Sequence, residues 1–283
     1  MFSINYKRGI FKITEDIGFG TSLNENIKTD IYMRQELLLS APLNYEFNIL
    51  KGSFRLLRPN YLIDLTKEES EIFKKIHKNT RYKINRAMNR DELSYFELTH
   101  PTDVEIAEFS AFFYPFAKER NIRSCDVKKL KAIRDQGALV ISYMADKNNR
   151  VLCYHVHHKE VEQGYLIYSA SKRYEKNDSS NRNLIGRANR YLHWKDIQSF
   201  KEKGCEWYNF SGMIFENEGI GGQNVNNFKL EYGPTTGYDS RTFFAKSIIG
   251  RIGVIFLYLK KKNSAEFKFT REIDPVKESI GLM

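Results

Sequence analysis

The spacing of apolar residues predicts three successive helices in the first half of the chain. Thr66 is followed three residues later by Glu69, which is the pattern of a capping box, and apolar residues then recur at helical spacing. This predicts a helix over 67–89. A second threonine–glutamate pair with the same separation predicts a helix over 103–120, and a basic stretch predicts a third over 127–135.

The pattern changes to that of strands after Gly137. Three runs are rich in Val, Ile, Leu and Tyr, and the Asn148–Asn149 pair between the first two suits a tight turn. The runs are Ala138–Ala145, Arg150–His158 and Gly164–Ala170. They predict an antiparallel meander.

Helices and strands alternate in the rest of the chain. Residues 178–181 are all competent N-caps for a helix that runs to about Lys203, where Gly204 ends it. The other expected elements are strands at Tyr45–Leu50, Ser53–Arg58, Cys205–Phe210 and Gly237–Phe244, a loop at Met213–Asn227, a short element at Phe228–Tyr232 and a helix at Ser247–Lys262. Together they indicate an α+β fold, with a mixed, largely antiparallel sheet flanked by helices.

The composition is that of a folded protein. Of the 283 residues, 41% are apolar and 14% aromatic, which excludes disorder as the dominant state. The three cysteines, Cys125, Cys153 and Cys205, are far apart and form no C-x-x-C pair, which excludes a disulfide framework and a cysteine-based zinc site. A reducing cytoplasm is the expected compartment.

Neither a secretory signal nor a membrane span is expected. Residues 1–20 contain no continuous apolar segment, and the longest apolar run, Ile252–Leu259, is far shorter than the roughly 20 residues that a spanning helix needs. The apolar residues of the C-terminal helix are followed by Lys260–Lys262. This helix could rest on a membrane surface, but a buried packing helix with a basic end is the commoner case.

The charge of the chain favours partners that carry phosphate. Lys and Arg number 45 against 35 Asp and Glu, a formal net charge of +10. Nucleic acid, a nucleotide-containing cofactor, a nucleotide sugar and an anionic membrane surface all fit such an excess, as does a solvated basic face.

A polar loop precedes the helix that begins near residue 180. First-turn amides have no partner within a helix and carry the positive end of its dipole, so they can hold a pyrophosphate. An ordinary capped helix with solvated arginines is the alternative. The residues predicted to bind the pyrophosphate are Ser180, Asn181, Arg182, Asn183 and Arg187.

Three motifs occur in order between about residues 60 and 235. They are Asp64–Thr66 with Asn79–Ala87, Leu192–Ile197 with Trp207–Gly212, and Phe228–Gly233. Together they resemble the Fem peptidoglycan-bridge aminoacyltransferases, a group within the GNAT acyltransferase superfamily. Two positions depart from the family pattern, because Asn209 replaces an aspartate and Ser211 replaces the first glycine of a turn.

The resemblance implies a tandem GNAT-like fold. Residues 1–100 would form a reduced N-terminal unit with its connecting helix, and residues 101–283 the C-terminal acyltransferase domain. Members of the group take either acyl-CoA or aminoacyl-tRNA as donor. The sequence has no long charged helical hairpin of the kind that some tRNA-using members carry, which favours acyl-CoA.

The leading hypothesis for function is therefore an N-acyltransferase. It would move an acyl group from acyl-CoA to the amine of a nucleotide-linked amino sugar in the synthesis of a surface polysaccharide such as O-antigen or capsule. One alternative is a Fem-like aminoacyltransferase that uses charged tRNA on a peptidoglycan precursor. Another is a non-catalytic basic module that binds nucleic acid or membrane.

Acyl transfer to an amine requires a base and donors for the oxyanion. Strand alternation puts His155 and His157 on one face, as candidate bases, and His158 on the other, although histidines satisfied within a sheet are commoner. The resemblance places Lys229 near the reacting acyl group; a surface lysine is the alternative. The predicted acceptor contacts are Arg81, Lys83, Arg190, Trp194, Tyr168, Asn209 and Tyr232. No metal is expected.

Overall fold

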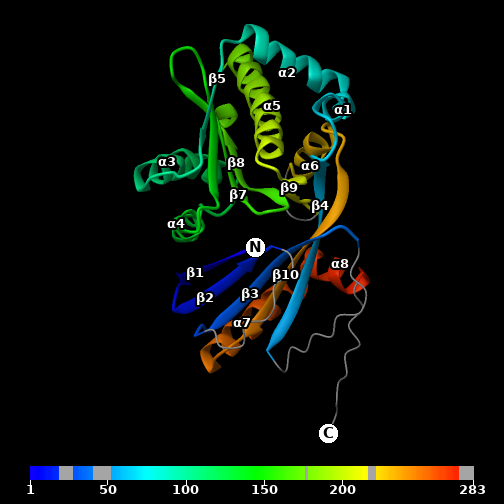
Figure 1. Ribbon diagram of the computed structural model, residues 1–283. Coiled ribbons are helices and arrows are strands. Elements are labelled where there is room, and N and C mark those ends of the chain that lie inside the picture. Colours follow the sequence, from blue (N-terminus) through cyan, green and yellow to red (C-terminus); the bar gives the residue numbers. More distant parts are fainter. Residues whose placement is uncertain (19–27, 41–51, 176–177, 216–220, 274–283) are drawn as a thin grey trace. The chain divides into compact units, whose positions relative to one another are not determined.

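The computed structural model describes residues 1–18, 28–40, 52–175, 178–215 and 221–273 (Figure 1). The chain packs as two compact units. The first unit consists of Met1–Tyr61, Ser211–Phe228 and Thr236–Met283, and the second of Leu62–Phe210 and Lys229–Thr235.

The first unit is built on a mixed sheet with strand order β1-β2-β3-β10-β4. β1 and β2 form an antiparallel hairpin, β2 and β3 are parallel, and β3 and β10 are antiparallel. The strands are β1 (Phe2–Arg8), β2 (Phe11–Ile17), β3 (Ile31–Leu38), β4 (Ser53–Asp64) and β10 (Thr235–Ala245), and the helices are α6 (Gly222–Leu230), α7 (Ile248–Lys261) and α8 (Ala265–Ile273). Phe54, Phe243, Val254 and Phe267 lie in its core.

The second unit has the sheet order β9-β8-β7-β6-β5. Neighbouring strands from β5 to β8 are antiparallel, whereas β8 and β9 are parallel. The strands are β5 (Ser94–Leu98), β6 (Leu139–Ala145), β7 (Val151–Lys159), β8 (Gln163–Ser171) and β9 (Trp207–Gly212), and the helices are α1 (Glu69–Lys75), α2 (Lys78–Arg90), α3 (Asp103–Glu119), α4 (Val127–Asp135) and α5 (Ser179–Glu202). Figure 1 shows α5 beside α2 on one side of this sheet and α3 with α4 on the other.

Helix α5 packs tightly on the sheet because the strand beneath it carries a glycine. A Cβ atom added at Gly164 of β8 would lie 2.4 Å from the ring of Phe200, so no other residue fits at this position without movement of the helix. Near its other end α5 contributes Ile185, Ala188 and Leu192 to a core cluster with residues of β6 and β7.

The predicted fold class is confirmed. The structure is α+β, and β6, β7 and β8 form the predicted antiparallel meander. The capping box at Thr102 and Glu105 opens α3 as expected, and α4 has the predicted bounds of 127 and 135.

Other elements differ from the prediction. The helix expected over 67–89 is broken, because Ile76 is extended and His77 begins a new helix. The hydroxyl of Thr66 donates to the carboxylate of Asp64 instead of capping α1. The element expected at Phe228–Tyr232 is mainly the last turn of α6. β1, β2, β3, β5 and α8 were not predicted individually, and β4 continues through Pro59. The loop expected at Met213–Asn227 is wrong from Gly222 onward, where α6 begins. Tyr45–Leu50 lies outside the described residues.

The expected domain boundary near residue 100 falls within the second unit, between β5 and α3. The division into two functional domains at that point stays a prediction. None of the helices in the described ranges is long and apolar enough to cross a membrane.

Replacing Gly164 by alanine tests the packing of α5. The added methyl group would meet the Phe200 ring, so we expect Gly164→Ala to lower the free energy of unfolding by about 1–3 kcal/mol in urea denaturation. Gly186→Ala is the matched control: a Cβ atom there meets nothing within 4 Å, and alanine favours the helix by up to about 1 kcal/mol. Equal stability of the two variants would contradict the packing.

Candidate functional site

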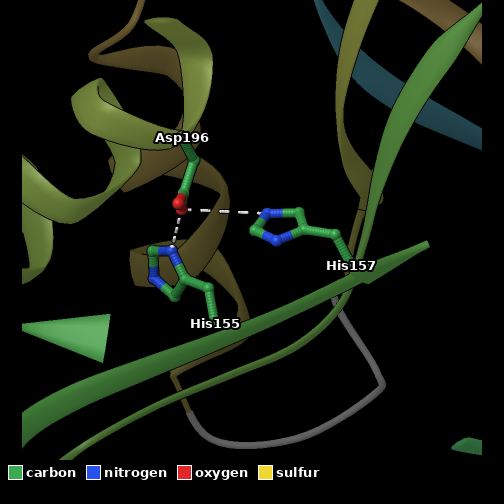
Figure 2. Close-up of side chains that lie close together, drawn as sticks. All are labelled: His155, His157 and Asp196. Carbon is green, nitrogen blue, oxygen red and sulfur yellow. Dashed lines mark hydrogen bonds and ion pairs between the residues drawn. The ribbon is translucent and has the colours of Figure 1, made fainter. Parts of the chain in front are cut away.

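A buried carboxylate lies between α5 and the sheet of the second unit. Asp196 of α5 points toward His155 and His157 of β7 (Figure 2). Its Oδ2 lies 2.6 Å from Nδ1 of His155, and its Oδ1 accepts a hydrogen bond of 2.6 Å from the hydroxyl of Ser142 on β6. These side chains are almost fully buried. A buried charge is costly unless it is paired and hydrogen-bonded, so these contacts stabilise Asp196 in its buried position.

A second set of hydrogen bonds adjoins the first. The hydroxyl of Tyr208 lies 3.2 Å from Nε2 of His157 and 3.0 Å from Nδ1 of His193. Nε2 of His157 is also 3.8 Å from Asp196, and the rings of His155 and His193 lie 4.0 Å apart between centroids. We name Ser142, His155, His157, His193, Asp196 and Tyr208 the histidine cluster.

Burial fixes the protonation of His157, His193 and Tyr208. It lowers the pKa of His157 to about 3 and the pKa of His193 well below its usual value, and it raises the pKa of Tyr208 well above 10. Both rings are therefore neutral and Tyr208 is a phenol at neutral pH. A phenol donates one proton, so at most one of the two imidazoles can accept from Tyr208 and the other donates to it.

The carboxylate decides which imidazole donates. Nε2 of His157 is near Asp196 as well as Tyr208, so a proton on this nitrogen is favoured. Nδ1 of His157, which has no hydrogen-bond partner within the described part of the chain, is then an acceptor and not an unsatisfied donor. With the proton of His157 on Nε2, Tyr208 donates to Nδ1 of His193, and the proton of His193 is then on Nε2.

The predicted alternation of the strand histidines is confirmed. His155 and His157 face Asp196, whereas His158 faces the other way, with its ring stacked on Tyr165 and its Nδ1 3.3 Å from a carboxylate oxygen of Glu160. The assignment of His155 or His157 as a base stays a prediction. Both are fully buried, and Nε2 of His155 lies 3.2 Å from Oδ1 of Asn189, so neither ring meets solvent directly.

Positive charges from three separate segments lie close enough to affect one another. Burial, and after it the nearby charge of Arg190, lowers the pKa of Lys83, and Arg173 lowers it further. Lys83 is on α2, Arg190 on α5 and Arg173 in the turn after β8. The charges of Lys229 and Arg190 also act on His193. We name Lys83, Arg173, Arg190 and Lys229 the cationic border.

One carboxylate lies among these cations. Oε2 of Glu231 accepts from Nε and Nη2 of Arg190 at 3.1 and 2.9 Å, and from the hydroxyl of Thr80 at 2.6 Å. Burial acts to raise the pKa of Glu231, but the hydrogen bond from Thr80 and the charge of Arg190 outweigh it, so the pKa is lowered. Tyr232, buried beside it, donates to the carbonyl of Arg190. Against the charges of Lys83, Arg173 and Arg190, the carboxylate of Glu231 leaves a net positive charge.

Several of the residues predicted to contact a ligand already have partners within the protein. Arg187 forms a bidentate ion pair with Asp91, and Arg81 donates to two backbone carbonyls. Trp194 is buried against Phe73. The amide of Asn209 donates to Gln163, and the hydroxyl of Tyr168 accepts from the backbone of Asp126. As ligand contacts these residues stay predictions.

The start of α5 is exposed, as the sequence indicated. Asp178 is the N-cap and accepts from the backbone of Asn181, whose side chain accepts from Arg150. Ser180, Arg182 and Asn183 face solvent. Of the predicted pyrophosphate contacts, these three are therefore accessible, whereas Asn181 and Arg187 already have partners within the protein.

The parallel strands β8 and β9 pair over a short distance only. Their ladder runs from Gln163↔Trp207 to Tyr165↔Asn209, yet β8 continues to Ser171. The strands therefore separate toward the turn that carries Arg173 and leads into α5. An extended ligand arm could pair with backbone at such an edge.

His155, His157 and Asp196 include the atoms of a conceivable metal site, since one ligand atom from each lies within 4.8 Å of the others. Two ligands of one tetrahedral zinc ion are about 3.3 Å apart. The 2.6 Å between His155 and Asp196 is instead a hydrogen-bond distance. The arrangement fits a proton-sharing pair better than a zinc site, and the expectation of no metal stays a prediction.

Four of the six residues of the histidine cluster had no predicted role. His193, Asp196 and Tyr208 lie within the motifs quoted above, and Ser142 lies within a predicted strand. A signal was present, because Asn189, His193 and Asp196 recur at helical spacing and so share one face. That the polar face was the buried one depended on β7, which places two histidines opposite it.

The fold is shared with a known protein, although the sequence alone finds no relative. No family model and no curated protein matches it. Among solved structures, FemX superposes with a TM-score of 0.51 at 12% identity, covering 64% of this chain and 61% of FemX, so less than two thirds of FemX is matched.

L-PGS from Bacillus licheniformis gives a TM-score of 0.47 at 12% identity, covering 90% of this chain and 84% of that one. Saccharomyces cerevisiae N-myristoyltransferase with bound myristoyl-CoA gives 0.39 at 10% identity, covering 76% and 51%. Both scores are too low to carry an argument. The chain has a GNAT-like fold. At the identity of FemX the likeness shows fold alone, and membership of the Fem family stays a hypothesis.

The neutral state of His157 predicts how stability depends on pH. Between about 6.5 and 3, the usual and the folded pKa, the unfolded chain binds a proton at His157 that the folded protein does not. Stability is therefore expected to fall as the pH drops through this range. His157→Gln should lose less stability than the parent between about pH 7.5 and 5 in urea denaturation. The exposed His100→Gln is the control, and identical slopes for both variants would refute a neutral His157.

Proposed function

We propose that the chain is an N-acyltransferase that moves an acyl group from acyl-CoA to the amine of a nucleotide-linked amino sugar, for the assembly of a surface polysaccharide. The observation that supports it most is the convergence of Lys83, Arg173 and Arg190, close enough to lower the pKa of Lys83. Such a concentration of positive charge favours a pyrophosphate, which would relieve the repulsion. Both coenzyme A and a nucleotide sugar carry one.

The place of this convergence suits an acyl-CoA. Arg173 follows β8 directly, where the pairing with β9 has ended, and the exposed first turn of α5 begins a few residues later. Pyrophosphate at the cations and the helix amides would leave the pantetheine arm extended along the edge of β8. The thioester would then lie farther along that edge.

Acyl transfer requires the protein mainly to position the two substrates and to supply charge. The neutral amine attacks the thioester carbonyl, a C–N bond forms and the C–S bond breaks; the proton that the nitrogen loses is taken up by the leaving thiolate, which departs as the free thiol. The ammonium proton of the acceptor must first be removed, and the oxyanion of the tetrahedral intermediate must meet a fixed donor. Lys229 is the proposed donor, since it is nearly buried and close to His193.

The rival donor is an aminoacyl-tRNA, as in a Fem-like aminoacyltransferase. A tRNA contacts protein through phosphates along its backbone, so its binding should depend on many dispersed cations and fall steeply with salt. The cationic border is compact and fits a small donor better. A non-catalytic basic module remains the third hypothesis.

Coenzyme A should raise the melting temperature of the protein, and Lys83→Met should abolish most of that rise. The variant loses a cation whose pKa the fold already lowers, so it should not reduce the melting temperature without ligand. Lys128→Met, at an exposed lysine of α4, is the matched control and should keep the full shift. A shift with charged tRNA and none with coenzyme A would select the rival donor.

Lys229→Met keeps the aliphatic stem and removes the charge. If Lys229 stabilises the oxyanion, steady-state kinetics with acyl-CoA and amino sugar should show kcat reduced roughly 100-fold or more with KM little changed. A phosphate-binding role would instead raise KM for one substrate. Values of kcat and KM within about twofold of the parent would show that Lys229 has no role in the site.

A further inference from the structure

Helix α7 of the first unit turns its large apolar side chains outward. The exposed fractions are 84% for Ile248, 50% for Ile249, 65% for Ile252, 38% for Ile255, 69% for Phe256 and 52% for Leu259. We name these six residues the α7 stripe. The expectation of a buried packing helix is wrong for this side of α7, because the residues on which it was based lie in solvent.

The inner face of α7 explains this orientation. A Cβ atom at Gly250 would lie 1.7 Å from the carbonyl oxygen of Asp30, and one at Gly253 would lie 2.8 Å from the ring of Phe11. Ser247 caps the helix and donates to the carboxylate of Asp30 at 2.7 Å. The helix is thus held close against the sheet by its glycines and cannot turn the stripe inward without clashes.

Basic residues border the stripe on both sides. At roughly 100° per residue the six apolar residues span about 120° of the helix, with Arg251 and Lys262 beyond one edge and Lys260 beyond the other. All three face solvent, as does Lys246 before the helix. Residues 246–262 include no Asp or Glu. An apolar face between cations is the pattern of a helix that lies in the headgroup region of an anionic bilayer.

We propose that α7 docks the protein on an anionic membrane surface, with the α7 stripe inserted among the acyl chains and its lysines and arginine on the lipid phosphates. The helix has 14 residues, too few for the roughly 20 that a spanning helix needs, so it lies on the bilayer. A second copy of the chain fits this face less well, because two such helices would bring like charges together. The inference does not depend on the proposed enzymatic function.

Binding to vesicles tests the proposal. The intact protein should cosediment with phosphatidylcholine vesicles that contain about 30% phosphatidylserine, and at least tenfold less with pure phosphatidylcholine. The double variant Ile252→Glu, Phe256→Glu should bind the anionic vesicles at least tenfold more weakly. The same changes at two exposed apolar residues elsewhere, Ile10→Glu and Val104→Glu, should reduce binding by no more than about threefold.

The outcomes separate the possible occupants. Equal loss in both double variants would assign binding to net charge and overturn a docking role for α7. The parent protein could instead fail to bind vesicles and sediment as a dimer, while the variant Ile252→Glu, Phe256→Glu sediments as a monomer. This result would make the α7 stripe a self-association surface and would also overturn the proposal. Unchanged melting temperatures would show that the variants remain folded.

Discussion

A single buried carboxylate constrains the second unit. Asp196 lies at the contact of α5 with the sheet, and it is tolerated there because His155 and Ser142 satisfy its oxygens. Removing one partner of a buried pair typically costs about 3–5 kcal/mol, so each of these contacts restricts where α5 can lie. The neighbouring pair of imidazoles around Tyr208 adds hydrogen bonds whose direction is fixed as well.

The position of α5 in turn determines the charged features around it. Its exposed first turn begins close to Arg173, its middle carries Arg190, and its buried face meets the histidine cluster. Arg190 connects the helix to Glu231, which accepts from Thr80 of α2. The cationic border is therefore assembled from segments far apart in sequence, held together by the packing of one helix. This is the physical basis for the anion site that the proposed function requires.

Local signals in the sequence predicted local structure well. The capping residues of α3 and the alternation along β7 depend only on residues a few positions apart. The helix and the two faces of the strand were therefore predictable. The break at Ile76 was not, because it is stabilised from afar by the hydrogen bond of the His77 amide to the carbonyl of Glu231. For the same reason the pairing of Ser142 with Asp196 carried no sequence signal. On α7 the same spacing fits a buried or an exposed stripe, and only the close approach of Gly250 to Asp30 decides between them.

Burial and Tyr208 hold His157 and His193 neutral, each with its proton on Nε2. A long-range ¹H–¹⁵N correlation spectrum of the imidazole rings reports protonation and tautomer for each histidine directly. We expect Nε2–H tautomers for both residues. Their nitrogen shifts should stay unchanged when the pH is lowered from about 8 to 5.5, since burial lowers the pKa of His157 to about 3 and that of His193 well below its usual range. Titration of either ring near pH 6.5, or a proton on Nδ1 of His157, would contradict this expectation.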